Sequence, residues 1–522
     1  MKRKIVIGFI LFIALCGIVV LSISISPTKK LENIQINPAK KPVIMMTVDS
    51  LMNEPLQKAI KEGKAPAFSF LINNGTFIEE VISSYPTMSV TIDSTILTGT
   101  YADQHKIPGL IWFNEDENRI VSYGSGFREI WNNGVKNVGA DSIIHLNKTH
   151  LSKDVETVYE ALEKDDRQSA SINGLLYRGN IPHQLTVPKL ISFANLLPKK
   201  IEISGPTLIS LGVLSQYSPE NHFHKFIWNK MGVNDHFTVN ELSYLIEHNK
   251  LPAFTFAYLP DLDKRVHKYG PDDLNGIEKA NQSLQEIFNN YSSWDEAIQE
   301  LTWIILGDSG QSLVKKEQDF ALVNLNELLK DYSNWDKENT DAQLAIATNE
   351  RMAYISINDQ QLELIDIVNS LKTDERIGFI AWKDGETNHV VSPQSSEELI
   401  FSKNGSYIDE YEQLWDIEGD ITILDLTVTE EGLIQYNSYP DALARLYGAL
   451  HSQEGRIIVV DAEPSYEFID EHSKDHAGGG AHGSLHKVDS IVPLIITGTD
   501  ELPEHNRLIN IKEWILELVS GS

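Results

Sequence analysis

Residues 43–49 read Val-Ile-Met-Met-Thr-Val-Asp, an apolar run of strand length that ends in an acidic residue. Two later runs have the same form. Residues 253–258 lead into a polar segment that contains Asp263, and residues 302–306 are followed by Gly307 and Asp308. Such runs are typical of buried strands in a parallel sheet. Because the carboxyl ends of these strands converge on one crevice, we expect Asp49, Asp263 and Asp308 to share a pocket.

The composition indicates a large globular protein with an acidic surface. The chain has 522 residues and a formal net charge of -30 at pH 7. This length favours a large core with an insertion, or two domains. The charge argues against a nucleic-acid-binding surface, and anionic substrates would need bound cations to offset it locally. Cys16 is the only cysteine, so disulfides, thiolate ligands and a thiol nucleophile are excluded from the folded part.

The first 26 residues have the pattern of a membrane anchor. The basic residues 2–4 precede an almost uninterrupted apolar run from Ile5 to about Ile25, which is long enough for a bilayer core of roughly 30 Å. The basic flank places the N-terminus in the cytoplasm and the rest of the chain outside. A cleaved signal peptide, giving a secreted protein, is the alternative, but the run lacks an Ala-x-Ala site. We therefore expect a signal anchor over 1–26 and a polar linker over 27–41.

From residue 43 onward, strand-length apolar runs alternate with helical patterns, which predicts an α/β fold of the βαβ type. Residues 57–73 are predicted to form the first crossover helix, and residues 91–98 a second that ends at Gly99. Between about 360 and 450, short apolar runs, turn signals and acidic loops indicate an inserted, partly β cap. The expected core therefore covers 42–359 and again 451–522, and it resumes at the apolar run 456–461.

Histidines at ligand spacing accompany the acidic residues. Asp263 and His267 are four residues apart, so on a helical turn they face the same way and can hold one ion. His482 lies in a Gly-rich loop, where the backbone can approach an ion closely. Three further histidines lie nearby, so the residues alone do not decide which of them binds: His472, His476 and His486. Carboxylates and imidazoles in one pocket suit zinc-like or manganese-like ions.

Each of these residues also has a purely structural interpretation. Asp49 could cap the helix that follows it. Asp263 and His267 could form a surface ion pair or an Asx-turn, and Asp261 could take the place of Asp263.

A hydroxyl-rich segment from Tyr85 to Tyr101 supplies the candidate nucleophile. It places hydroxyl groups just before and at the start of a predicted helix. A helix N-terminus favours an alkoxide and an incoming phosphate, and a bound metal would activate the hydroxyl further. The alternative is that Ser89 or Thr91 only caps the helix.

Taken in order, these motifs resemble the nucleotide pyrophosphatase/phosphodiesterase (type I phosphodiesterase) branch of the alkaline phosphatase superfamily. After the strand that ends at Asp49, the matching strings are Tyr85-Pro-Thr-Met-Ser89, Thr98-Gly-Thr-Tyr-Ala-Asp-Gln-His105, Asp263-Lys-Arg-Val-His-Lys-Tyr-Gly-Pro271, Asp308-Ser-Gly310 and His482-Gly483. The likeness covers most of the chain from residue 43 to the C-terminus, apart from the cap. It implies a doubly wound, mostly parallel α/β sheet flanked by helices, with the cap inserted.

The resemblance also implies two divalent metal ions, with zinc as the expected metal. The first ion would bind Asp263, His267 and His482. The second would bind Asp49, Asp308 and Ser89, where Ser89 matches the family's metal-bound nucleophile.

One ligand position differs from the family pattern. A histidine normally follows the second aspartate, and here that residue is Ser309. Ser309 and His476 are therefore further possible ligands. Because a hydroxyl binds metals less well than an imidazole, we expect the second ion to bind weakly or to be a harder ion, manganese or calcium.

The expected function is that of an anchored, extracytoplasmic hydrolase that cleaves phosphodiester or pyrophosphate bonds in a small phosphoester, with Ser89 as the nucleophile. The alternatives are a phosphomonoesterase of the same superfamily, and a surface binding protein that has kept the fold but lost the second ion through Ser309.

Overall fold

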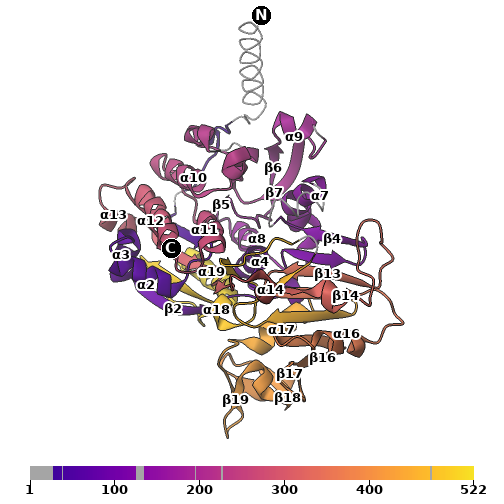
Figure 1. Cartoon of the computed structure of the whole chain (residues 1–522). Coiled ribbons are helices and arrows are strands. Elements are labelled where there is room, and N and C mark those ends of the chain that lie inside the picture. Colours follow the sequence, from indigo (N-terminus) through magenta and orange to yellow (C-terminus); the bar gives the residue numbers. More distant parts are fainter. Residues whose placement is uncertain are drawn as a thin grey trace, which may run out of the picture.

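The computed structural model describes residues 28–37, 39–124, 135–193, 195–224, 227–470 and 473–521. The expected anchor over residues 1–26 lies outside these ranges. Within them, no helix is long and apolar enough to cross a membrane. The described part of the chain has two lobes, each built around its own large β-sheet (Figure 1).

The larger lobe contains the predicted α/β sheet, which confirms the fold class. Its seven strands lie in the order β2-β24-β10-β1-β9-β5-β8. Strands β10, β1, β9, β5 and β8 are parallel, and β24 runs antiparallel to both β10 and β2. The bounds are β1 Val43–Val48, β2 Thr76–Ile82, β5 Ser169–Ile172, β8 Leu208–Ser210, β9 Phe254–Leu259, β10 Thr302–Gly307 and β24 Ile491–Thr497.

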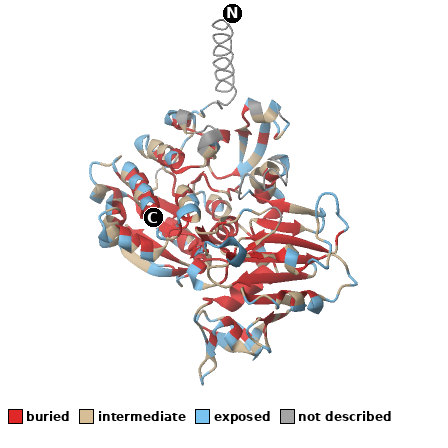
Figure 2. Cartoon of the chain, in the orientation of Figure 1, coloured by how far each residue is buried: buried red, intermediate tan, exposed pale blue. Residues whose placement is uncertain are grey.

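Helices cover both faces of this sheet. Successive side chains of a strand point to opposite faces, so a strand made of apolar residues presents an apolar surface on each side. In β1, Ile44, Met46 and Val48 join one apolar core, and Val43 and Met45 join the other. The strand is therefore buried on both sides, and Figure 2 shows buried residues concentrated in the interior of both lobes. The first core is completed by α2 (Asn53–Lys61), α3 (Pro66–Asn73), α10 (Asp235–Glu247), α12 (Leu274–Phe288) and α13 (Trp294–Glu300), and the second by α4 (Ser89–Thr98), α8 (Val158–Lys164) and α19 (Ile511–Gly521).

The prediction of one crossover helix over residues 57–73 is wrong, because two helices occupy this stretch. Helix α2 ends at Lys61 and α3 begins at Pro66. Between them Gly63 has a φ of +73°, which glycine adopts without strain. Pro66 takes the first position of α3, where a missing N–H is tolerated. The second predicted helix is present as α4, which is ended by Gly99 in the left-handed conformation.

The smaller lobe is built on a nine-stranded sheet and contains the partly β insertion. The strands lie in the order β13-β14-β21-β15-β16-β17-β20-β19, with β18 paired to β17. Their bounds are β13 Leu344–Asn349, β14 Met352–Ile357, β15 Ile377–Asp384, β16 Thr387–Val391, β17 Glu398–Asp409, β18 Leu414–Gly419, β19 Leu426–Val428, β20 Leu433–Tyr436 and β21 Ile457–Ala462.

This sheet extends beyond the expected cap, residues 360–450, at both ends. Strand β21, which the sequence predicts to return the chain to the main sheet, pairs instead with β14 and β15. Its six residues are all buried, so its apolar pattern suits the interior of either sheet. Only the tertiary pairing decides which sheet it joins.

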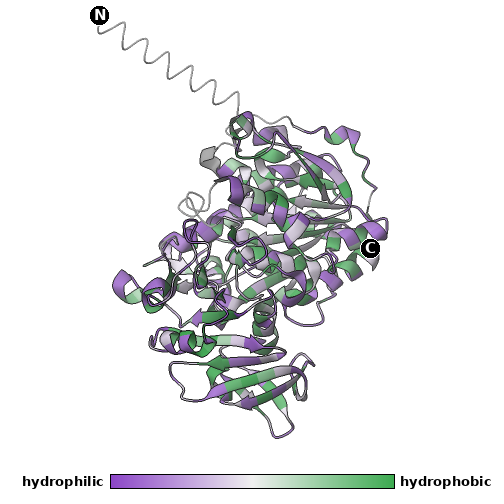
Figure 3. Ribbon diagram, turned by 90° about the vertical axis from the view of Figure 1, so that its right-hand side faces the viewer, coloured by the Kyte–Doolittle hydropathy of each residue, from purple (hydrophilic) through white to green (hydrophobic). Residues whose placement is uncertain are grey.

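One part of the second sheet faces solvent, and another part contacts the larger lobe. In β17, buried and accessible residues alternate over the first five residues, 398–402, and residues 403–408 are all accessible. Figure 3 shows hydrophilic and hydrophobic stretches side by side in this part of the lobe. Such alternation is typical of a sheet with one solvated face. At the other end, the turn between β13 and β14 contacts the larger lobe, where buried Arg351 pairs with Asp489.

Candidate metal centre

Five predicted site residues, distant in the sequence, come from the carboxyl edge of the main sheet and the loops beside it. Asp49 directly follows β1 and Asp308 directly follows β10, and the parallel register aligns these two strand ends. Asp263 and His267 lie on α11, the helix after β9, and His482 follows the short strand β23. The bounds are α11 Asp261–Tyr269, β11 Ser312–Leu313 and β23 Gly480–Ala481, and β11 pairs with β23.

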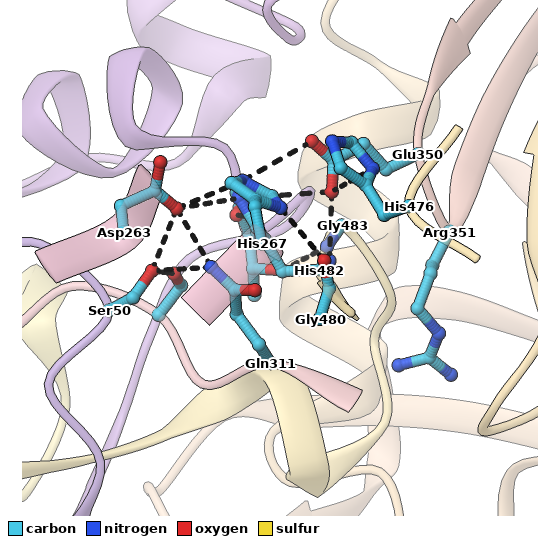
Figure 4. A network of polar contacts seen from close by, with 12 residues as sticks. Ser50, Asp263, His267, Gln311, Glu350, Arg351, His476, Gly480, His482 and Gly483 are labelled. Carbon is cyan, nitrogen blue, oxygen red and sulfur yellow. Dashed lines mark hydrogen bonds and ion pairs between the residues drawn. The ribbon is translucent and has the colours of Figure 1, made fainter. Parts of the chain in front are cut away.

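The first group consists of Asp263, His267 and His482, whose ligand atoms lie within 4.8 Å of one another. Asp263 Oδ1 lies 3.0 Å from His267 Nε2 and 3.7 Å from His482 Nε2 (Figure 4). Backbone carbonyls accept from the Nδ1 side of each ring, Gly480 O at 2.8 Å from His267 and Thr87 O next to His482. This orientation leaves each Nε2 free to bind a metal. The group can therefore hold one divalent cation.

The second group is formed by Asp49, Asp308 and Ser309. Asp308 Oδ1 accepts hydrogen bonds from the backbone N–H groups of Ser50 and Ser309, both at 2.8 Å. Asp308 Oδ2 is buried and has no hydrogen-bond partner among the described residues. Asp49 accepts a hydrogen bond from the Tyr258 hydroxyl. A buried carboxylate oxygen without a partner is unfavourable, so this group fits a bound cation.

Two polar side chains that the sequence did not single out join the two groups. Ser50 Oγ lies 3.0 Å from Asp263 Oδ1 and 3.4 Å from Ser309 Oγ. Gln311 Nε2 donates to Ser50 Oγ and to Asp263 Oδ1, each at 2.8 Å (Figure 4). Ser50 has a φ of +60°, which is uncommon outside glycine. The only sequence signal for either residue is that it adjoins Asp49 or the 308–310 string.

Ser89 is the first residue of α4. The N-cap position is taken by Met88, whose side chain makes no capping hydrogen bond. The Thr91 hydroxyl is buried without a partner among the described residues, so it does not cap the helix either. Burial raises the pKa of Asp308, and the neighbouring Ser89 side chain partly opposes this effect. Thr87, in contrast, accepts a hydrogen bond from the Gly483 N–H at 2.7 Å. Ser89 is thus the hydroxyl that lies beside Asp308 at a helix N-terminus.

The electrostatics of the centre favour a cation on the side of Asp49 and Asp308. Burial raises the pKa of Asp49 well above its ordinary value, and the charges of Asp308 and Asp263 raise it further. Burial alone would lower the pKa of His267, but Asp263 and Glu350 raise it to about 10. Burial opposes the charge on Asp263 as well, yet the two histidines hold its pKa below the ordinary range. A divalent cation would neutralise the surplus negative charge.

His476 lies beside His267 and makes its polar contacts away from the second group. Its Nδ1 lies 2.7 Å from Glu467 Oε1 and 3.9 Å from Glu350 Oε2. Its ring stacks on that of His267, with 4.3 Å between centroids. These contacts are with glutamates, whereas the sequence interpretation made His476 a possible ligand of the second ion.

The other candidates from the sequence take structural contacts. Asp261 forms an ion pair with Lys230 at 3.0 Å and accepts from the backbone N–H of Asp235. His486 precedes a short helix, and its Nδ1 accepts from the Val488 N–H at 3.2 Å. His472 lies outside the described residues.

A mostly parallel α/β sheet with two groups of candidate cation ligands at its carboxyl edge is the architecture that the motif resemblance implies for a phosphoric ester hydrolase. Within that class, residues 43–485 match the family "Type I phosphodiesterase / nucleotide pyrophosphatase". The match covers most of the chain, so the protein belongs to this family and the resemblance seen in its motifs is confirmed. No curated protein matches the sequence.

Several solved structures share the fold. Murine ectonucleotide pyrophosphatase/phosphodiesterase 5 is 13% identical, with a TM-score of 0.56 over 92% of this chain and 95% of its own. The human protein is 14% identical, with a TM-score of 0.55 over the same shares. Phosphonoacetate hydrolase from Sinorhizobium meliloti 1021, in complex with phosphonoformate, is 13% identical, with a TM-score of 0.53 over 93% of this chain and 98% of its own. At these identities the likeness shows a common fold.

Proposed function

We propose that this protein is a metal-dependent hydrolase that cleaves phosphodiester or pyrophosphate bonds with Ser89 as the nucleophile. One observation carries the proposal. Ser89 begins α4 beside Asp308, whose buried Oδ2 has no hydrogen-bond partner in the described part of the chain. A helix N-terminus stabilises both an alkoxide and an incoming phosphate. The family of the chain supports the class of reaction.

Two divalent ions, with zinc as the expected metal, fit the two groups of ligands. The residues that would hold the first ion are Asp263, His267 and His482. Those that would hold the second are Asp49, Asp308 and Ser89, with a weaker contribution from Ser309. When bound, such ions neutralise negative charge on the attacking and leaving oxygens.

In the proposed reaction, Ser89 Oγ forms a bond to phosphorus while the bond to the leaving oxygen breaks. The leaving group takes up a proton in exchange for the one that Ser89 loses, and Ser89 is left esterified to the phosphoryl group, which keeps the other substituent of the substrate. Water then attacks the phosphorus, and Ser89 Oγ leaves and regains its proton. The N–H groups of Ser89 and Val90 at the start of α4 can stabilise the non-bridging oxygens in both steps, whereas those of Thr91 and Ile92 donate to Met88 O.

Ligands of the solved relatives belong to the same chemical class. Murine ectonucleotide pyrophosphatase/phosphodiesterase 5 has been solved as an inactive variant, with a threonine replaced by alanine, in complex with AMP. The phosphonoacetate hydrolase has been solved with phosphonoformate and with phosphonoacetate. A hydroxyl residue that is replaced in an inactive variant, and ligands with a tetrahedral phosphorus, agree with the proposal.

We also propose that the catalytic part faces the outside of the cell. The support is the basic cluster at residues 2–4, followed by the apolar run from Ile5 to about Ile25. Positive charge beside such a run favours retention of that end in the cytoplasm.

The substrate class is tested by a turnover screen of diesters against monoesters. Metal-free protein receives zinc, manganese or calcium in turn. We expect bis-p-nitrophenyl phosphate to be hydrolysed faster than p-nitrophenyl phosphate, and faster turnover of the monoester would identify a phosphomonoesterase instead. Intact and lysed cells are compared in the same assay. Equal diester hydrolysis by both supports outward orientation, and activity that appears only after lysis contradicts it.

Replacing Ser309 by histidine should tighten the second ion. An imidazole is a better zinc ligand than a hydroxyl, and changes around a metal alter its affinity by roughly 10–100-fold. We therefore expect Ser309→His to lower the Kd of the weaker zinc site by about tenfold or more, as measured by calorimetric titration of metal-free protein. Ser309→Ala is the control and should weaken the same site only slightly. An unchanged Kd in Ser309→His would remove residue 309 from the second site.

A further inference from the structure

Glu350 occupies an unusual position close to the first group of ligands. It lies in the turn between β13 and β14, and its φ is +59°. A residue with a side chain is uncommon in this conformation, and such strain often occurs at functional sites. Only 15% of the Glu350 side chain is exposed. A strained, largely buried carboxylate therefore reaches the centre from the second sheet.

The Glu350 carboxylate lies within ligand spacing of two metal-binding nitrogens. Its Oε1 is 3.6 Å from His267 Nε2, and its Oε2 is 3.9 Å from His482 Nε2 (Figure 4). The spacings from Asp263 Oδ1 to the same two nitrogens are 3.0 and 3.7 Å. Tetrahedral zinc ligands at roughly 2.0–2.1 Å from the ion lie about 3.3–3.4 Å apart. These four spacings are close to this value, but Glu350 faces His267 with Oε1 and His482 with Oε2, so its carboxylate would bind the ion through one oxygen or through both.

Backbone hydrogen bonds fix this carboxylate to the loop that carries His482. The His482 N–H donates to Glu350 Oε2 at 3.0 Å, and the Arg351 N–H donates to His482 O at 2.9 Å. The Phe468 N–H donates to Glu350 O at 2.7 Å. Buried Arg351 also pairs with Asp489, which anchors the turn to the larger lobe. The turn is therefore held in place by both lobes.

We propose that Glu350 is a fourth protein ligand of the cation held by Asp263, His267 and His482. This rests on the proposed function and adds to it, because the ion then has two imidazole and two carboxylate ligands. His476 is not one of these four ligands, because its Nδ1 is engaged by Glu467 at 2.7 Å and lies 3.9 Å from Glu350 Oε2. A fourth protein ligand should make this ion the more tightly held of the two, and because zinc can expand to five ligands, a substrate oxygen can still reach it. The second lobe thereby contributes directly to the centre.

The test measures metal affinity and needs no turnover. Metal-free full-length protein is titrated with zinc in competition with a chromophoric chelator, and the visible spectrum is recorded after loading with cobalt(II). Glu350→Gln keeps an oxygen acceptor for the His482 N–H and is the main variant. Glu463→Gln is the matched control, because Glu463 is a half-buried glutamate of the same lobe whose charge acts on Arg351. Circular dichroism and melting curves establish that each variant folds.

We expect Glu350→Gln to raise the Kd of the tighter ion by about tenfold or more and to change the cobalt spectrum, while Glu463→Gln leaves both unchanged. His476→Ala should have a much smaller effect on the same ion. An unchanged Kd and spectrum in Glu350→Gln would overturn the proposal. A second result would also overturn it: Glu350→Gln and His476→Ala both keep the tight ion but both lose another ion. That result would mean that a different cation lies between His267, Glu350 and His476.

These outcomes are independent of the proposed catalytic role of Ser89. If a Ser89→Ala variant kept its activity while Glu350→Gln lost zinc affinity, only the proposed nucleophile would fail. If Ser89→Ala lost turnover and Glu350→Gln bound zinc normally, only the fourth ligand would fail.

Discussion

Ser89→Ala is expected to reduce diester hydrolysis by a factor on the order of 10⁴ or more, since loss of the nucleophile in enzymes of covalent mechanism has effects of this size. The fold should persist, because Ser89 is only half-buried at the first position of α4. The first ion should remain bound, because its proposed ligands lie on other elements. The measurement is the rate of bis-p-nitrophenyl phosphate hydrolysis together with the zinc content of the purified variant.

A second hydroxyl of the same helix provides the matched control. Ser94 is buried in α4 and donates to Val90 O at 2.7 Å. Ser94→Ala should lower the free energy of unfolding by about 1 kcal/mol and leave kcat nearly unchanged. Hydrolysis by Ser89→Ala at the native rate would show that another group attacks phosphorus.

Removal of divalent ions is expected to abolish turnover and to destabilise the fold. Without a cation, the buried carboxylates of Asp49 and Asp308 and the half-buried carboxylate of Asp263 remain close together, and their repulsion raises the pKa of Asp49 beyond the effect of burial. A single ion at a hundredfold excess over its Kd stabilises the folded state by about 2.7 kcal/mol. Melting curves with and without a chelator measure this loss, and adding zinc back should restore both stability and turnover.

The loss of stability on metal removal should increase from pH 5 to pH 8. In the metal-free chain, burial raises the pKa of Asp49 and of Asp308, so their favourable neutral form is lost as the pH rises above the ordinary aspartate range. The pKa of His267 is raised to about 10 by Asp263 and Glu350 against the effect of burial, so its contribution also declines as the pH rises above its ordinary value near 6.5. Both effects have the same sign. Equal melting temperatures with and without metal at pH 8 would contradict this account.

Several features of the fold could be predicted because they depend on local pattern. The runs before Asp49 and Asp308 are apolar on both faces, which is the requirement for a strand covered by helices on each side. The break between α2 and α3 also had a local signal, the glycine at 63 and the proline at 66, which a single predicted helix overlooked. The membership of β21 in the second sheet had none, because a fully buried strand pattern does not specify its neighbours.

The sequence by itself determined that Asp49, Asp263 and Asp308 would meet, since each follows a strand or begins a helix at the carboxyl edge of one parallel sheet. Only the tertiary structure decided which other groups surround them. Ser50 and Gln311 join the two groups through hydrogen bonds, and Glu350 arrives from a separate sheet. Strand direction and periodicity are local properties that a sequence carries, whereas the docking of one lobe on another depends on contacts between residues with no fixed spacing along the chain.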